Sequence, residues 1–160
     1  MLHLRPAVRS DVTVILSLIR ALAGYEREPQ AVVATEEDLL RDGFGAAPRF
    51  RVLLCEVDGA VAGFALYFFT WSTWQGRPTL FLEDLFVRPE LRGQGAGLSL
   101  MRRLAKIAVE EGCTRFHWQV LDWNAPSIAF YEGLGARIMK EWQAVRLDGE
   151  ALQRLASEQR

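Results

Sequence analysis

A glycine-rich segment near the middle of the chain is the first candidate for chemistry. It is made of Arg92, Gly93, Gln94, Gly95, Ala96 and Gly97. The segment joins a strand-like run, residues 80–87, to a helix-like run, residues 97–111. At such a junction the free N–H groups and the dipole of the helix attract an anion, and glycines let a ligand approach the backbone. The spacing fits neither the dinucleotide fingerprint nor the Walker loop, so both of these nucleotide-binding motifs are excluded.

Positive charge surrounds this segment. Arg88 and Arg92 flank it, and Arg102 and Arg103 follow one to two turns into the helix. Together they predict a local site the size of a pyrophosphate. The alternative is that the glycines only form a tight connection.

Two adjacent carboxylates interrupt the apolar run that precedes the loop. Glu83 and Asp84 are neighbours on a predicted strand, where successive side chains point to opposite faces. At most one of them therefore faces a given site. The alternative is a solvated strand end or an ion pair with an arginine.

A third group of polar residues has helical spacing. Asn124, Ser127 and Tyr131 lie at i, i+3 and i+7, which places them on one face of a short helix. Asn124 is also a suitable N-cap residue, and Tyr131 is either a core tyrosine or a ligand of the site.

The elements that position these residues alternate between strand and helix. Apolar patterning and turn residues predict strands over residues 2–6, 50–57, 60–69, 80–87, 115–121 and 142–147. Caps and periodicity predict helices over residues 11–24, 35–45, 97–111, from 124 onward and after 148. The order predicts an α/β protein with an antiparallel front half and a parallel strand–helix–strand core.

Composition limits the possible classes of protein. A chain of 160 residues, 50% hydrophobic and 24% charged, suits one domain, residues 1–160. The longest apolar run, residues 60–69, is too short for a membrane span, and a net charge of -1 argues against a nucleic-acid partner. No export signal is seen at the N-terminus, so a cytoplasmic location is expected. Cys55 and Cys113 fit reduced thiols, and His3 and His117 show no metal-ligand spacing.

The loop R-x-x-G-x-G after a strand, followed by Asn124 and Tyr131, resembles the GCN5-related N-acetyltransferases. The resemblance is nearest to the diamine acetyltransferase branch, which includes spermidine/spermine and thialysine N-acetyltransferases. Further motifs in the same order are Arg5-Pro6-Ala7, Tyr25-Glu26, Asp42-Gly43-Phe44-Gly45, Tyr67-Phe68-Phe69-Thr70, Leu82-Glu83-Asp84, Asp122-Trp123-Asn124 and Phe130-Tyr131. The resemblance implies a mixed sheet of six to seven strands flanked by four to five helices, with strands 4 and 5 splayed to bind acetyl-CoA.

The resemblance also implies roles for individual residues. Tyr131 would protonate the departing thiolate of coenzyme A, and Glu83 would accept or relay the proton of the amine. An alkylamine and a glutamate differ by about 6 pKa units, or roughly 8 kcal/mol, so a water oriented by Glu83 is the preferred proton acceptor. Acetyl-CoA would be held by Leu85, Phe86, Val87, Arg92, Gly93, Gln94, Gly95, Ala96, Gly97, Leu98, Asn124, Ser127 and Tyr131.

The acceptor is expected to be a small primary amine. The chain reads Ser72-Thr73-Trp74 where the polyamine enzymes place an Asp before their Trp, so one carboxylate for a distal ammonium is missing. A thialysine-like or lysine-like amino acid or a short diamine is therefore favoured over spermine. The residues expected to bind it are Tyr25, Glu26, Ser72, Trp74, Glu83, Asp84, His117, Trp118, Gln119 and Trp142.

The leading hypothesis is an acetyltransferase that works by direct attack of the amine in a ternary complex, without a metal. One alternative is a spermidine/spermine N1-acetyltransferase, and another is a non-catalytic acyl-CoA-binding module. A mere binder has no need of Glu83 and Tyr131, so their presence favours the enzyme. The family's habit also implies a homodimer.

Overall fold

A hairpin with a two-residue turn forms two neighbouring strands of the central sheet. Strands β2 (Arg51–Val57) and β3 (Ala60–Ser72) are joined by Asp58 and Gly59, whose φ angles are 50° and 83°. Two successive positive φ angles match the twist of antiparallel strands, which is why Asp-Gly is favoured in such turns. The hairpin predicted from the sequence is therefore confirmed.

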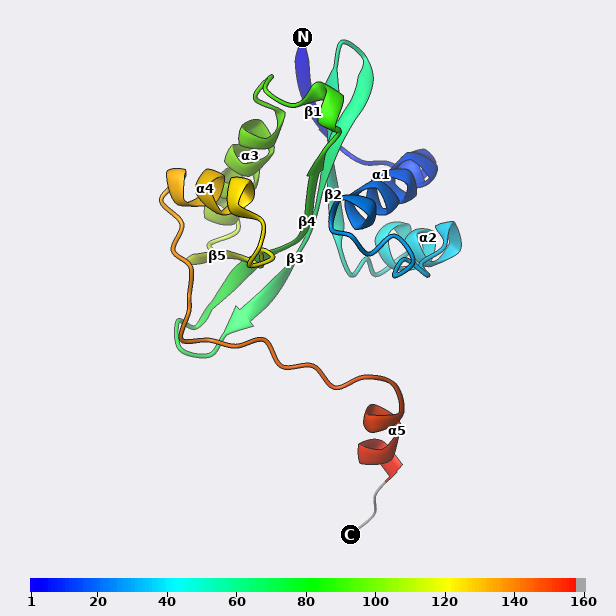
Figure 1. Ribbon diagram of the computed structural model, residues 1–160, viewed down its shortest axis with the longest axis vertical. Coiled ribbons are helices and arrows are strands. Elements are labelled where there is room, and N and C mark those ends of the chain that lie inside the picture. The colour runs from blue at the N-terminus through cyan, green and yellow to red at the C-terminus, as the bar shows by residue number, and fades with distance from the viewer. Residues whose placement is uncertain (158–160) are drawn as a thin grey trace. The chain divides into compact units, whose positions relative to one another are not determined.

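The sheet has five strands in the order β1-β2-β3-β4-β5, shown in the computed structural model of Figure 1, which describes residues 1–157. Strands β1 (Leu2–Pro6), β2, β3 and β4 (Arg77–Val87) pair antiparallel, and β5 (Arg115–Trp118) pairs with β4 in parallel. The antiparallel front half and the parallel pair agree with prediction.

The strand count does not agree with prediction, because six to seven strands were expected. Residues 142–147 were expected to form the last strand, but they have no regular secondary structure. Within the described residues they have no partner strand to complete a hydrogen-bonded ladder, and Val145 among them is 95% exposed. Strand β5 is also shorter than expected and ends at Trp118.

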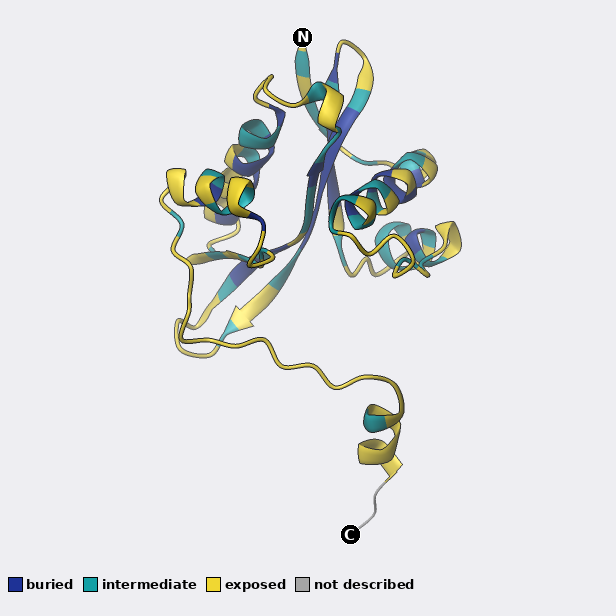
Figure 2. Cartoon of the chain, in the orientation of Figure 1, coloured by how far each residue is buried: buried dark blue, intermediate teal, exposed yellow. Residues whose placement is uncertain are grey.

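Helices cover both faces of the sheet. Figure 1 shows α1 (Val12–Tyr25) and α2 (Glu36–Phe44) on one face and α3 (Ala96–Glu110) on the other. The buried strip runs along the strands and along the helix sides that face them (Figure 2). One core cluster joins α1 and α2 to the sheet through Val12, Ile15, Leu16, Leu18, Leu22, Leu39, Val52, Leu54, Phe64, Leu66 and Phe86. Short 3-10 turns, Arg9–Asp11 and Pro89–Leu91, precede α1 and the glycine-rich loop.

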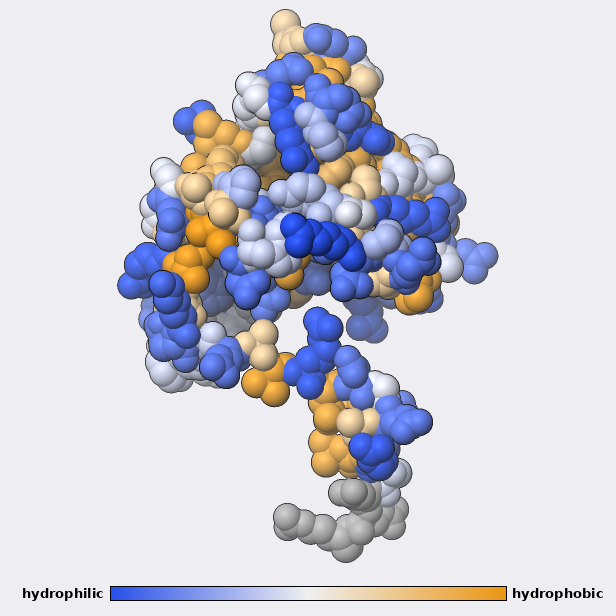
Figure 3. Space-filling model, viewed as in Figure 1, coloured by the Kyte–Doolittle hydropathy of each residue, from blue (hydrophilic) through white to orange (hydrophobic). Residues whose placement is uncertain are grey.

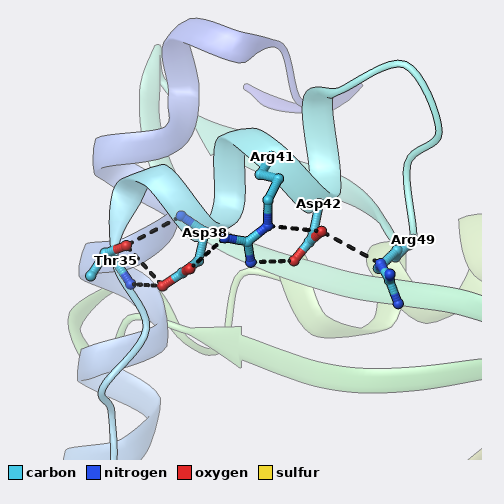
Figure 4. Close-up of polar contacts among 5 residues, drawn as sticks. All are labelled: Thr35, Asp38, Arg41, Asp42 and Arg49. Carbon is cyan, nitrogen blue, oxygen red and sulfur yellow. Dashed lines mark hydrogen bonds and ion pairs between the residues drawn. The ribbon is translucent and has the colours of Figure 1, made fainter.

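A capping box starts α2, as its sequence predicts. The backbone N–H of Asp38 donates to the Thr35 hydroxyl, and the Thr35 N–H donates to the Asp38 carboxylate. Figure 4 shows that Arg41 then bridges Asp38 and Asp42, and that Asp42 also pairs with Arg49. This network ties the end of α2 to the segment that leads into β2.

The buried side of α3 is rotated slightly from the predicted one. The helical spacing of apolar residues in the sequence predicts a buried stripe of Leu98, Met101, Leu104, Ala105 and Ala108, but Leu98 is only half-buried and Ala105 is exposed. The buried positions are Ala96, Leu100, Met101, Leu104, Ile107 and Ala108.

Contacts along the chain define two compact units, Met1–Leu121 and Asp122–Arg160. The second unit contains α4 (Ala125–Gly133) and α5 (Gly149–Ser157). Figure 3 shows hydrophobic side chains along one side of α5, where Leu152 and Leu155 are exposed. The expectation of a single domain over residues 1–160 stays a prediction.

Two further features follow from the described residues. None of the helices over residues 1–157 is long and apolar enough to cross a membrane. Cys55 is buried and Cys113 is half-buried, and both are free thiols, as predicted.

Candidate active site

The edge of β4 is open along its second half. Strand β4 pairs with β3 as far as Val87, but its pairing with β5 runs only from Thr79 to Leu82, opposite Arg115 to Trp118. Residues 83–87 therefore have no strand beside them on the β5 side. In a ladder, alternate residues direct their N–H and C=O groups to each side, so this edge presents amides from the segment that contains Leu85, Phe86 and Val87. The pairing of β4 with β5 ends where β5 itself ends, at Trp118, so the splaying of strands 4 and 5 stays a prediction.

A close contact between β3 and β4 supports this edge. A Cβ atom on Gly63 would lie 2.4 Å from the carbonyl oxygen of Phe86 and 3.0 Å from the Cα of Val87. Only glycine fits there without moving β4. Gly63 was not predicted from the sequence, although a glycine inside a strand pattern is a known sign of close backbone approach.

The glycine-rich loop follows β4 and leads into α3. Gly93 and Gly95 have φ angles of 78° and 81°, in the left-handed region that favours glycine. Gly95 is the N-cap of α3, no side chain caps this helix, and its first turn has no acidic residue. The first N–H groups of a helix have no partner within the helix, so this end is suited to an anion. Ala96 is buried, and Gly97 and Leu98 are half-buried.

The two arginines that flank the loop are bound to strand carbonyls. Arg88 Nε donates to the Val61 oxygen at 3.3 Å, and Arg92 Nε donates to the Val87 oxygen at 2.9 Å. The guanidinium carbon of Arg92 also lies 4.8 Å from the ring centre of Tyr25 and 5.7 Å from that of Phe86. These contacts fix the Nε edge of each guanidinium and leave its other N–H groups for a ligand.

A group of three carboxylates lies at the start of the open edge. Burial, together with the negative charges of Glu83 and Glu26, raises the pKa of Asp84 from 3.8 to about 6. Burial also raises the pKa of Glu26, which is the C-cap of α1. Such a cluster, partly shielded from water, attracts a cationic group.

The register of β4 changes at these carboxylates. Leu66 pairs with Asp84 and Tyr67 pairs with Leu82, so Glu83 has no partner on β3. A bulge of this kind interrupts the strict alternation of side chains that the sequence suggested for Glu83 and Asp84. The charge of Glu83 also acts on Asp84, its neighbour in the chain.

The other predicted acceptor residues of the first unit fall into two groups. His117 and Trp118 pair with Phe81 and Leu82, where β5 leaves β4, and Gln119 follows directly. These three are therefore near Glu83. Ser72 is instead at the tip of the β3–β4 hairpin, opposite Arg77, about 20 Å along the strand from Glu83 at 3.3 Å per residue. Trp74 lies in that turn and is 80% exposed, so the structure does not bring Ser72 and Trp74 to the carboxylates.

The remaining predicted residues belong to the second unit. Asn124 is the N-cap of α4, and its side chain accepts a hydrogen bond from the Ser127 N–H at 3.4 Å, which confirms the predicted cap. Tyr131 is buried, with its ring 5.4 Å from that of Phe130. Trp142 is exposed, in the segment without regular structure.

Metal ligands are not assembled in the part of the chain that the structure describes. No group of three or more His, Cys, Asp or Glu side chains in residues 1–157 is arranged to hold a metal ion.

Comparisons with known proteins agree with this geometry. The profile of the acetyltransferase (GNAT) family matches residues 16–136. The thialysine N-epsilon-acetyltransferase of Sus scrofa is 40% identical over 164 residues, 96% of this chain and 96% of that protein. Spermidine/spermine N(1)-acetyltransferase-like protein 1 of Homo sapiens is 37% identical over 167 residues, 98% of this chain and 24% of that protein. The structure of an integron cassette protein from V. cholerae has a TM-score of 0.83 at 27% identity and covers 98% of both chains.

The family profile matches most of the chain, and the relatives are similar over nearly its whole length, so family membership is established. The chain belongs to the acetyltransferase (GNAT) family. It is an N-acetyltransferase, as the names of its relatives state for them, and the resemblance seen in its motifs is confirmed.

Proposed function

We propose that this protein transfers the acetyl group of acetyl-CoA to a primary amine of a small molecule, by direct attack of the amine in a ternary complex. The observation that carries the proposal is the continuous path in the first unit from the three carboxylates, along the open edge of β4, to the uncapped N-terminus of α3. This path offers a cation site, a row of amides and an anion site in succession.

Acetyl-CoA fits the residues along this path. A Cβ on Gly93 or Gly95 would meet no atom within 4 Å, so the space directly beside the loop backbone is open at these two residues. The amides of residues 93–98 would hold the pyrophosphate, and the edge of Leu85, Phe86 and Val87 would hold the pantetheine arm and polarise the acyl carbonyl. When bound, acetyl-CoA supplies an acetyl thioester, which an amine nitrogen can attack.

The proposed role of the carboxylates is to bind the amine and to help remove its proton. An alkylammonium with a pKa of ~10.4 must lose a proton before attack, and transfer to a carboxylate at ~4.3 costs roughly 8 kcal/mol. For Asp84, with a pKa of about 6, the difference is about 4 units, or roughly 6 kcal/mol. Because neither carboxylate alone is a strong enough base, the proposed step uses a water held by Glu83 to relay the proton from the ammonium group to solvent, while Asp84 and Glu26 bind that group.

Tyr131 is the proposed proton donor to the departing thiolate. Its ordinary pKa of ~10 lies about 1.5 units above that of a thiol, so the transfer is uphill by only about 2 kcal/mol. Asn124 and Ser127 form the cap of the same helix, and we propose that they contact the coenzyme.

The proposed acceptor is a thialysine-like or lysine-like amino acid or a short diamine. The name of the relative at 40% identity over 96% of both chains supports this choice, as does Ser72 in place of a carboxylate. Ser72, Trp74 and Trp142 are included among the proposed acceptor-binding residues only because of the family resemblance. A spermidine or spermine acceptor is the second candidate, supported by the human relative at 37% identity. The homodimer and the cytoplasmic location expected from the sequence remain part of the proposal.

A panel of amines tests this function. Protein and acetyl-CoA are incubated with thialysine, lysine, putrescine, spermidine and spermine in turn, and free thiol is followed. We expect thialysine, lysine or putrescine to give the highest rate. A spermine rate well above that of thialysine contradicts the argument from Ser72, and no thiol release with any amine contradicts the function.

Substitution of Tyr131 by Phe tests the proton donor. The substitution removes only the hydroxyl, so turnover is expected to fall by at least about 10²-fold while acetyl-CoA affinity changes little. Turnover is measured by thiol release and affinity by calorimetry. Unchanged turnover removes the role assigned to Tyr131.

A further inference from the structure

Arg92 belongs to two parts of the first unit at once. Along the chain it is the first residue of the glycine-rich loop, directly before Gly93. In space its guanidinium lies 4.8 Å from the ring centre of Tyr25, the last residue of α1, and its Nε donates to the Val87 oxygen. It therefore joins the loop, the end of β4 and the end of α1.

The contact with Tyr25 has the chemistry of a cation over an aromatic face. Phe86 supplies a second ring at 5.7 Å, and it is buried in the core. A guanidinium is planar and stacks on such rings, whereas the compact ammonium of lysine does not reproduce both the stack and the Nε hydrogen bond. Arginine is thus the residue suited to this place.

Tyr25 continues directly into the carboxylate group. The next residue, Glu26, caps α1, and its N–H is bonded to the Leu22 carbonyl. The charge of Glu26 acts on Asp84, so the two carboxylates are close in space. The end of α1 that carries the Tyr25 ring therefore also carries one of the three carboxylates.

We propose that Arg92 is a positioning residue that couples acetyl-CoA binding at the glycine-rich loop to amine binding at Tyr25 and Glu26. The inference rests on the proposed function. Amides that grip a pyrophosphate fix the loop, the fixed loop holds Arg92 against Tyr25, and Glu26 is thereby held among the carboxylates. Arg92 acts through these neighbours and not on the reacting atoms.

The coupling must be reciprocal. If bound coenzyme raises the affinity for the amine by some factor, bound amine raises the affinity for the coenzyme by the same factor. An exposed cation–π contact supports a factor of about fivefold, which equals about 1 kcal/mol at 1.4 kcal/mol per tenfold.

The experiment measures this factor in variants. The Kd of coenzyme A is determined by calorimetry without and with a saturating amine, the one of the panel with the highest turnover. Wild type is expected to show tighter coenzyme binding with the amine by about fivefold. Arg92→Lys and Tyr25→Leu are each expected to reduce the factor to near one, and the double variant to reduce it no further, as for two parts of one contact.

Matched variants separate coupling from general damage. Tyr25→Phe keeps the ring and is expected to retain the factor, and Arg20→Lys, an exposed position on α1, is the control for an arginine change elsewhere. If Tyr25→Leu does not fold, Arg92→Lys alone decides. A factor unchanged in Arg92→Lys overturns the coupling while the transferase activity stands. No turnover by wild type with any amine overturns the proposed function and this inference with it.

Discussion

Replacing Asp84 by Asn is expected to stabilise the protein at neutral pH and not at acidic pH. Burial, Glu83 and Glu26 raise the pKa of Asp84 from 3.8 to about 6 in the folded chain. The folded state therefore binds more protons than the unfolded state between about pH 4 and pH 6, and the free energy of unfolding falls as pH rises through this window. Asn resembles the protonated, uncharged form of Asp, so the Asp84→Asn variant does not lose this free energy of unfolding as pH rises.

The size of the effect follows from the same difference. About 2 pKa units correspond to about 3 kcal/mol, and partial exposure of the half-buried side chain reduces this to about 1 to 2 kcal/mol. For a chain of this length that is a rise in Tm of about 3 to 6 °C above pH 7.

Thermal unfolding at pH 4 and pH 7.5 measures the change. The Tm difference between Asp84→Asn and wild type is expected to be near zero at pH 4 and positive at pH 7.5. Glu37→Gln, at an exposed position on α2, is the control for removing a carboxylate from the surface. Equal Tm differences at both pH values, or destabilisation at pH 7.5, would refute the assignment of Asp84 as a carboxylate held against its charge.

The remaining predictions concern three glycines. Gly63→Ala is expected to destabilise the fold by about 1 to 3 kcal/mol, because its Cβ would meet the Phe86 carbonyl, and to weaken acetyl-CoA binding by displacing the edge of β4; urea unfolding and calorimetry measure the two effects. At Gly24 an added Cβ would meet no atom within 4 Å, so Gly24→Ala is expected to leave the free energy of unfolding unchanged or to raise it by up to about 1 kcal/mol. Similar losses of stability in Gly63→Ala and Gly24→Ala would contradict the steric argument. Gly95→Ala forces a φ of 81° on alanine at a cost of about 1 to 2 kcal/mol, so calorimetry is expected to show weaker acetyl-CoA binding; unchanged affinity would contradict the role of this loop geometry.

Local signals in the sequence predicted much of the fold. The Asp58–Gly59 turn and the Thr35 capping box depend on residues close together in the chain, so their geometry could be read from residue types. The glycine-rich loop was placed correctly between strand and helix for the same reason.

Features that depend on distant residues could not be predicted. The bulge opposite Leu66 and Tyr67 is set by how β3 and β4 pair, and no local pattern in the sequence marks it. The contact of Arg92 with Tyr25 joins residues 67 positions apart, and no local pattern marks it. Residues 142–147 have strand-like composition, but a strand also needs a neighbour, which the described residues do not supply.

Because the second half of β4 is paired with a strand on one side only, hydrogen exchange of its amides can report whether a ligand is bound at its open edge. Amides of residues 84–87 that bond to β3 are expected to exchange slowly with deuterium, whereas those on the other side have no strand partner among residues 1–157, so the proposed ligand would slow their exchange. Along this strand, amides that exchange slowly with or without ligand therefore alternate with amides whose exchange rate depends on the ligand. Exchange followed residue by residue would map where an acyl chain lies without any label on it.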